Sequence, residues 1–320
     1  MPGILVVAEA TEGQIAPISF ELIGAAKQLS AQGGGNVSAI IAGDESVAQK
    51  LVAGGADQAY AATNPALQSG IAEAYLPAVN AAIQQSGADI VLLGQTSLGR
   101  DLGPALAFAN NTAVAMDTVE LKLDGGRLRA TRNAYGGNAR AEHTWKAPLQ
   151  VVTVKAKSFD APEGVSGSGG VTAITDGAEP RAKVVGTEKA QATGIRLEDA
   201  AIVISGGRGL GDPSAFGMLE ELASTLRQAA VGASRAACDL GWYPPAQQVG
   251  LTGKTVSPDL YIAVAISGAS QHMAGMAGSK NIVAINKDAD ANMVKVSRFA
   301  VVDDYKKVIP ALIEEIKKLG

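Results

Sequence analysis

The hydrophobic positions of this 320-residue chain gather in short apolar runs that alternate with amphipathic stretches. The runs are rich in β-branched residues and too short for ordinary helices, which is typical of strands buried in a parallel sheet. In the first half we predict strands at 4–8, 37–42, 58–61 and 90–94 and helices at 19–29, 47–52, 67–85 and from 97 onward. Strands spaced by helices in this way indicate βαβ units with right-handed crossovers.

The pattern changes between residues 117 and 155. Short runs at 119–123, 128–132, 139–144 and 149–155 are punctuated by glycine, and Asp124-Gly125-Gly126 is a hairpin signal. We predict that these runs form an antiparallel extension of the first sheet. Residues 160–196 carry little pattern beyond a glycine-rich segment at 164–170. One or two edge strands are expected within them, for instance at 183–186.

A second alternation follows. It predicts strands at 200–205, 230–232, 260–266, 282–285 and 299–302, and helices at 215–229, 234–239, 269–276 and 305–319. The expected fold class is α/β, with two doubly wound domains whose sheets are mostly parallel. We place the boundary between an N-terminal α/β domain, residues 1–192, and a C-terminal nucleotide-binding domain, residues 193–320.

Composition excludes several classes of protein. The net charge is −4 and no basic stripe occurs, so we expect no nucleic-acid binding. The single cysteine fits a reducing compartment, and no apolar run approaches the roughly 18 residues of a membrane span. The chain begins with a strand and not a basic leader. We therefore expect a cytoplasmic protein, or a mitochondrial matrix protein if this is a processed eukaryotic form.

Four loops in the second half carry the candidate chemistry. They follow predicted strands and are rich in glycine, hydroxyl or basic residues: 205–209, 232–235, 248–253 and 267–272. In a parallel sheet they converge on the carboxyl edge, where ligands bind. Glycine lets the backbone approach a ligand, and the arginine fork suits phosphate. These loops together predict a site for an anionic, flat cofactor such as a dinucleotide.

Each loop also has a simpler explanation. The glycines around Arg208 are more commonly a turn, Ser234 could serve only as a helix N-cap, and Arg235 could simply form an ion pair. His272 taken alone is more commonly a satisfied histidine at a helix start. We expect no metal site, because no Cys/His cluster has the spacing of ligands. A Gly-x-Ser-x-Gly elbow and a Gly-x-x-x-x-Gly-Lys-Ser/Thr loop are absent as well.

Longer motifs resemble one known family. In order along the chain, the segments are SGGRGL (205–210), AVGASRAA (230–237), QVGLTGK (248–254), LYIAVAISGASQHMAGM (260–276) and IVAINKD (282–288). Together they closely resemble the α (large) subunit of electron transfer flavoproteins. TSLGRDL (96–102) and RNAYGGNA (132–139) resemble the N-terminal domain of that family. The resemblance spans essentially the whole chain.

The resemblance implies an electron carrier and not an enzyme. It implies FAD held mainly by the C-terminal domain, a heterodimer with a β (small) subunit that contacts the N-terminal domain, and AMP or a second FAD in that partner. Electrons would pass from flavin-containing dehydrogenases to an acceptor such as a membrane quinone oxidoreductase, through a stabilised anionic semiquinone. The cofactor-binding residues that it implies are Arg208, Ser234, Arg235, Gln248, Val249, Gly250, Leu251, Thr252, Ser267, Gly268, Ala269, Ser270, Gln271, His272, Asn286, Asp304 and Tyr305.

The family pattern also implies roles within that set. Pyrophosphate and ribityl oxygens would be held by Arg208, Ser234, Ser267 and Gln271, and the adenosine end by Asn286 and Asp304. Redox tuning would come from Thr252 at flavin N5, Arg235 over the ring, and His272 near the C2 carbonyl. A cation and a histidine donor near the N1–C2=O side stabilise negative charge on the ring in a low-dielectric pocket.

Three positions depart from the family pattern. Leu251 stands where a glutamine is usual, Ala265 replaces a usual glycine, and Asn292 a usual proline. The first change removes an amide close to the flavin, so redox tuning is the property we expect it to alter. FAD binding is expected to survive, because Thr252 is retained.

Three other functions stay open at this point. An electron-bifurcating flavoprotein would hold two flavins per heterodimer and not one. A nicotinamide-nucleotide enzyme would be colourless where a flavoprotein is yellow. A scaffold with a vacant site is disfavoured, because loops of this kind are costly to order without a ligand.

Overall fold

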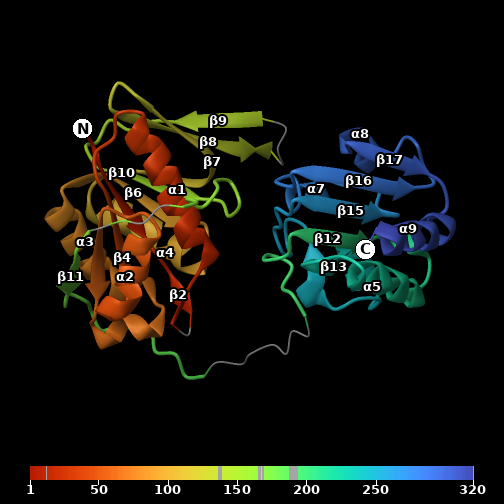
Figure 1. Cartoon of the computed structure of the whole chain (residues 1–320), viewed down its shortest axis with the longest axis horizontal. Helices are drawn as coiled ribbons and strands as arrows, with labels where there is room; N and C mark the ends of the chain where they lie inside the picture. The colour runs from red at the N-terminus through yellow and green to blue at the C-terminus, as the bar shows by residue number, and fades with distance from the viewer. Residues whose placement is uncertain (12, 136–138, 165–166, 168, 187–193, 320) are drawn as a thin grey trace. The chain divides into compact units, whose positions relative to one another are not determined.

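A computed structural model describes the chain except for residues 12, 136–138, 165–166, 168, 187–193 and 320. The described residues divide into two compact units, Met1–Glu188 and Lys189–Gly320 (Figure 1). The boundary predicted between residues 192 and 193 lies outside the described residues, and it stays a prediction.

The described part of the N-terminal unit has a nine-stranded sheet in the order β11-β5-β4-β1-β6-β10-β7-β8-β9. Its strands are β1 (Gly3–Val7), β4 (Val37–Ala42), β5 (Gln58–Ala62), β6 (Ala88–Gly94), β7 (Val114–Asp124), β8 (Arg127–Ala134), β9 (Ala139–His143), β10 (Gln150–Val154) and β11 (Val171–Ile174). A separate short hairpin joins β2 (Ala10–Thr11) to β3 (Gln14–Ile15). The strands predicted at 4–8, 37–42, 58–61 and 90–94 are confirmed and pair in parallel.

Helices cover both faces of this sheet. They are α1 (Pro17–Ala31), α2 (Glu45–Ala53), α3 (Ala72–Ser86) and α4 (Ser97–Ala109). Residues of α1 and α2 pack in one apolar layer, and residues of α3 and α4 in the layer on the opposite face. The helix predicted at 67–85 is wrong at its N-terminal end. A separate 3-10 helix at Pro65–Ser69 is terminated by Gly70, which has φ +67°, and α3 begins only at Ala72.

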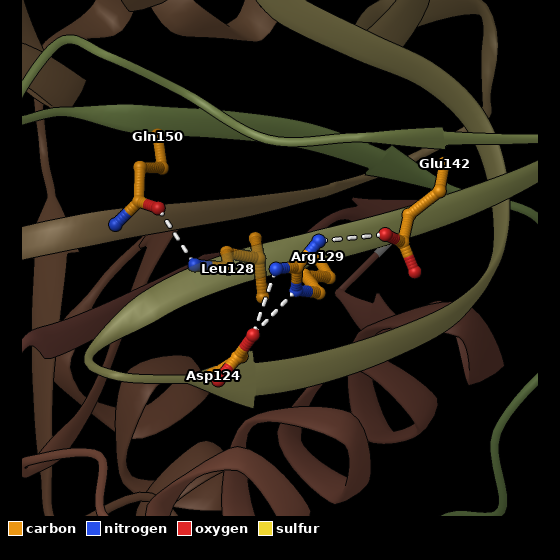
Figure 2. A network of polar contacts seen from close by, with 5 residues as sticks. All are labelled: Asp124, Leu128, Arg129, Glu142 and Gln150. Carbon is orange, nitrogen blue, oxygen red and sulfur yellow. Dashed lines mark hydrogen bonds and ion pairs between the residues drawn. The ribbon is translucent and has the colours of Figure 1, made fainter.

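The antiparallel extension consists of β7, β8 and β9. The predicted hairpin at Asp124 is confirmed, because Gly125 and Gly126 both have positive φ, as a two-residue turn of the favoured hand requires. Arg129 pairs with Asp124 and with Glu142 on either side of it (Figure 2).

The run predicted at 149–155 belongs elsewhere. It forms β10, which is fully buried and lies between β6 and β7, parallel to both, so its assignment to the antiparallel extension is wrong. The buried Gln150 side chain accepts a hydrogen bond from the Leu128 N–H at 2.8 Å and so links β10 to the hairpin (Figure 2). The edge strand expected within residues 160–196 is confirmed as β11, paired with β5, but the instance given at 183–186 is wrong, since those residues are not in a strand.

The C-terminal unit has a six-stranded, all-parallel sheet in its described residues, in the order β14-β13-β12-β15-β16-β17. Its strands are β12 (Ile202–Gly206), β13 (Ala229–Ser234), β14 (Gln248–Val249), β15 (Leu260–Val264), β16 (Asn281–Asn286) and β17 (Phe299–Val302). Counted from β12, this is the 3-2-1-4-5-6 order of dinucleotide-binding sheets. The chain reverses its direction of growth between β12 and β15, which creates a crevice at their carboxyl ends.

Helices again cover both faces. Helices α5 (Phe216–Ser224) and α9 (Tyr305–Leu319) pack on one face, and α7 (Ser270–Ala274) and α8 (Asn292–Val296) on the other. The short α6 (Arg235–Asp239) follows β13. The helix predicted at 215–229 is too long at its C-terminal end, because α5 ends at Ser224 and the chain enters β13 at Ala229.

Candidate functional site

A cavity of about 620 Å³ opens at the carboxyl edge of the C-terminal sheet, where the strand order reverses. Its volume lies within the usual range of ligand sites. All four predicted loops contribute to its wall, together with the segment after β16. The lining residues are Gly207, Arg208, Gly209, Ser234, Arg235, Ala236, Asp239, Gln248, Val249, Gly250, Leu251, Thr252, Ala265, Ile266, Ser267, Ala269, Gln271, His272, Asn286, Asp288 and Ala291.

The loop after β12 packs tightly on the end of β15. A Cβ atom at Gly207 would overlap the Ala265 carbonyl group, and one at Gly209 would lie 2.8 Å from it. Side chains are therefore excluded from these two positions, which brings the loop backbone to the crevice. The Arg208 side chain remains exposed at the cavity wall. This is the arrangement that a phosphate-binding turn needs: backbone at close range and one permanent cation.

The loop after β13 contributes a hydroxyl group and a second cation. The Ser234 side chain accepts a hydrogen bond from the Ala237 N–H at 3.4 Å and thereby caps α6. Arg235 pairs with Asp239 through a 3.4 Å contact between exposed side chains. Both simpler explanations thus describe real contacts of these residues. Neither excludes ligand binding, because Ser234 and Arg235 also line the cavity.

The loop after β14 is held by one hydrogen bond within it and one to α7. The Gln248 amide donates to the Thr252 hydroxyl oxygen at 3.0 Å, and the Leu251 N–H donates to the Gln271 carbonyl oxygen at 2.8 Å. Thr252 is exposed at the cavity, and the Leu251 side chain is 69% exposed. An apolar side chain at such exposure leaves a hydrophobic surface at the wall, where an amide would have offered a hydrogen bond.

The loop after β15 makes two left-handed turns. Ala265 has φ +52° and Gly268 has φ +83°, so only the second position carries the residue that this conformation favours. Ser267, Ala269 and Gln271 line the cavity, whereas Gly268 and Ser270, which we also predicted, do not. Gly268 faces α8 instead, where a Cβ atom would clash with the Met293 backbone.

His272 lies at the start of α7 and is buried, with 7% of its surface exposed. Its Nε2 atom is 2.8 Å from the hydroxyl oxygen of the fully buried Tyr261. Burial lowers the pKa of His272 to about 4, a shift that the neighbouring Val249 backbone partly opposes. His272 is therefore neutral at physiological pH. Tyr261 is absent from the predicted set, although its hydroxyl stands out in the apolar run 260–266.

The two residues predicted for the adenosine end, Asn286 and Asp304, and the neighbouring predicted cofactor residue Tyr305 are not all brought to this cavity. Asn286 lines it, and its amide donates to the Ile266 carbonyl oxygen at 2.9 Å. Tyr305 lines an adjoining cavity of about 260 Å³, and its hydroxyl donates to the Leu210 carbonyl oxygen at 2.7 Å. Asp304 lines neither of the two and pairs with Lys287 at 3.0 Å.

The chemistry of the wall fits FAD. The exposed Arg208 suits a pyrophosphate group, and a mixed apolar and hydroxyl wall with Arg235 suits a planar ring that takes up negative charge. The buried Nδ1 atom of His272, a residue that lines the cavity, has no hydrogen-bond partner of normal geometry, and a buried polar atom of this kind is one that a ligand can satisfy. Within the described residues, no group of acidic, histidine or cysteine side chains could hold a metal ion, and none of the helices is long and apolar enough to cross a membrane.

Comparison with known proteins agrees with this geometry. Residues 4–201 match the electron transfer flavoprotein domain, and residues 196–277 match the electron transfer flavoprotein FAD-binding domain. The chain is 38% identical to electron transfer flavoprotein subunit alpha of Bacillus subtilis, over 99% of this chain and 98% of that protein. It is 41% identical to the subunit alpha of Megasphaera elsdenii, over 99% and 96%, and 36% identical to Protein FixB of Clostridium saccharobutylicum, over 99% and 97%. The chain belongs to the electron transfer flavoprotein family, as an α subunit whose C-terminal unit is an FAD-binding domain.

Proposed function

We propose that this chain binds FAD in the 620 Å³ cavity and carries electrons from flavin-containing dehydrogenases to an acceptor such as a quinone oxidoreductase. The observation that supports this most directly is the convergence of four glycine- and hydroxyl-rich loops at the point where the strand order reverses. The relatives named above are called subunit alpha, so a β subunit is the proposed partner.

Different residues of the cavity wall would bind different parts of FAD. Arg208, Ser234, Ser267 and Gln271 would hold the pyrophosphate and ribityl oxygens, because they supply one cation, two hydroxyl groups and an amide to the cavity wall. Thr252 would face the ring from the loop after β14, and Arg235 from the loop after β13. Leu251 would shield its edge from water. When bound, FAD supplies the redox chemistry, and the protein sets how easily it is reduced.

Asp304, predicted for the adenosine end, and its neighbour Tyr305 do not line the larger cavity. Tyr305 lines the smaller cavity, and Asp304 pairs with Lys287 of its wall. The match to the FAD-binding domain ends at residue 277, before either residue. We keep them as a proposal in which Asn286, shared by both cavities, connects the main site to the smaller one. For Asp304 to bind a ribose hydroxyl group, its ion pair with Lys287 would have to break, or its carboxylate would have to accept the hydroxyl hydrogen bond while the ion pair stays in place.

The test is purification of the chain together with its β subunit, followed by quantification of flavin and AMP. One FAD per heterodimer, with AMP present, supports a simple electron carrier, and two FAD molecules would support the bifurcating alternative instead. A complex that is purified without FAD and takes up none when FAD is added contradicts the proposal. Variants at Arg208 and Ser267 should lower FAD affinity without loss of folded structure, since both side chains are exposed.

A further inference from the structure

A pair of polar side chains lies within an apolar layer next to the cavity. Tyr261 is completely buried in the layer that packs beneath α7 and α8, together with residues such as Val256 and Met276, and His272 of α7 is 7% exposed. The Tyr261 hydroxyl oxygen and His272 Nε2 are 2.8 Å apart. A polar pair in such surroundings is costly unless its hydrogen bonds are made, so the direction of this bond is strongly determined.

The sheet fixes where the tyrosine hydroxyl lies. Tyr261 belongs to β15, in register with Val203 of β12 and Ile282 of β16, so its backbone is held on both sides. Its side chain reaches the first turn of α7, where His272 lies. The Ser205 side chain of β12 stands beside the same hydroxyl group but makes no hydrogen bond of normal geometry. The phenol therefore has one well-made hydrogen bond, to His272.

Both side chains of the pair are uncharged. Burial lowers the pKa of His272 to about 4, with the Val249 backbone opposing, and burial holds the pKa of Tyr261 well above its usual range, with Ser205 opposing. A neutral imidazole has one N–H donor and one acceptor nitrogen, and the hydrogen bond at one nitrogen decides which is which.

The surroundings distinguish the two tautomers. The Val249 backbone favours protonation of the imidazole, and Nε2 is already in contact with Tyr261, so a proton on Nε2 would leave the other nitrogen, Nδ1, without the proton that these surroundings favour. If the proton is on Nδ1, that group acts as a donor beside Val249, and Nε2 accepts from the Tyr261 hydroxyl. The second arrangement gives the phenol proton the acceptor at 2.8 Å, Nε2, and turns no lone pair toward the Val249 backbone.

We propose that Tyr261 is a positioning residue: its hydroxyl donates to Nε2 of His272 and so holds the imidazole as the neutral tautomer with its proton on Nδ1. His272 then offers the cavity an uncharged N–H donor. Nδ1 has no partner of normal geometry in the protein, so a carbonyl oxygen of a bound cofactor is the group that it would serve. Permanent positive charge in the ring-binding part is left to Arg235. The role of His272 toward the cofactor rests on the proposed FAD site, whereas the tautomer held by Tyr261 does not depend on it.

The experiment is ¹⁵N NMR of the full chain labelled in histidine. His143 is the other histidine of the chain, lies exposed on β9, and can be removed by His143→Gln so that one imidazole remains. At neutral pH we expect a protonated Nδ1 and an unprotonated Nε2, with no titration until the pH falls to about 5, because the pKa of His272 is lowered to about 4. Addition of FAD should shift the Nδ1 resonance.

Tyr261→Phe removes the donor and keeps the ring. It should move proton occupancy from Nδ1 toward Nε2 and change the reduction potential of the bound flavin. Tyr243→Phe is the matched control, because it also removes a hydroxyl, hydrogen-bonded to Glu220, but on the opposite face of the same sheet. It should leave the tautomer and the potential unchanged.

The outcomes separate the two proposals. A proton on Nε2 in the unmodified protein, or a Tyr261→Phe protein with an unchanged tautomer, overturns the positioning role. If Tyr261→Phe does not fold, the tautomer measured in the unmodified protein still tests the positioning role of Tyr261. If FAD binds and the Nδ1 resonance does not move, His272 is not the donor to the cofactor. A complex that takes up no FAD contradicts the proposed function alone, because the tautomer can be measured without flavin.

Discussion

Gly268→Ala is the substitution whose effect the structure specifies most closely. Gly268 has φ +83°, a conformation that costs an L-residue about 1–2 kcal/mol. A Cβ atom at this position would also lie closer than 3.0 Å to backbone atoms of Asn292 and Met293. Because the obstruction is backbone, the loop or α8 must move, at a cost of about 1–3 kcal/mol. The stiffer unfolded chain returns about 0.4–1 kcal/mol. We expect the C-terminal unit to lose roughly 2–4 kcal/mol of stability.

Gly217→Ala is the matched control. Gly217 lies exposed in α5, and nothing is within 4 Å of the Cβ atom that alanine would add. Alanine is the better helix former, so this variant should gain about 0.5 kcal/mol. The same chemical change is thus expected to act with opposite signs at two positions of one unit.

The assay is urea unfolding followed by Trp242 fluorescence. Trp242 lies in the C-terminal unit, and Trp145→Phe removes the signal of the other tryptophan from all proteins compared. Retention of FAD through gel filtration gives a second readout, since Gly268 lies between the cavity residues Ser267 and Ala269. A Gly268→Ala protein with the midpoint of the parent and full FAD retention would refute the reasoning.

Three further predictions concern the same unit. Ala265→Gly should stabilise the protein by up to about 1 kcal/mol, because it relieves the left-handed conformation of Ala265; a clear loss in urea unfolding would show that its methyl group makes a needed contact. The pKa of His272 is lowered to about 4, against roughly 6.5 when the chain is unfolded. Below pH 6.5 the unfolded chain therefore binds a proton that the folded protein does not, and the free energy of unfolding should fall by up to roughly 3 kcal/mol as the pH drops from 6.5 toward 4. A His272→Gln protein should lose that part of the pH dependence, and an equal slope in both proteins would count against it. Arg235→Ala should lower the potential for one-electron reduction of the bound flavin, and Arg235→Lys should stay closer to the parent. A redox titration that finds no change would show that Arg235 does not act on the flavin ring.

The strands and loops of the C-terminal unit were predictable because their signals are local. A run such as Leu260–Val264 buries both faces, so it reads as a central strand without knowledge of its neighbours. The loops that follow the strands could be assigned to one edge as soon as the sheet was taken as parallel. The strand order itself could not be predicted, because pairing joins residues that are far apart in the sequence.

The errors have physical causes of the same kind. β10 follows three hairpin strands in the sequence, which suggested a fourth, yet all five of its residues are buried, as a central parallel strand requires. Tyr261 was missed because a buried hydroxyl shows its partner only in three dimensions. Gly268 and Ser270 belong to a motif at the cavity, but the left-handed turn at Gly268 directs that position to α8.

The central place of β10 also bears on how this chain is made. During synthesis β1, β4, β5 and β6 emerge first, and β7, β8 and β9 follow, but neither group pairs with the other directly. The strand that joins them leaves the ribosome after both, at residues 150–154, and only the edge strand β11 of this sheet comes later. A nascent chain that stops before residue 150 therefore holds two unfinished sheet edges in water. Such a stalled product should need chaperone protection that a chain only ten residues longer would not.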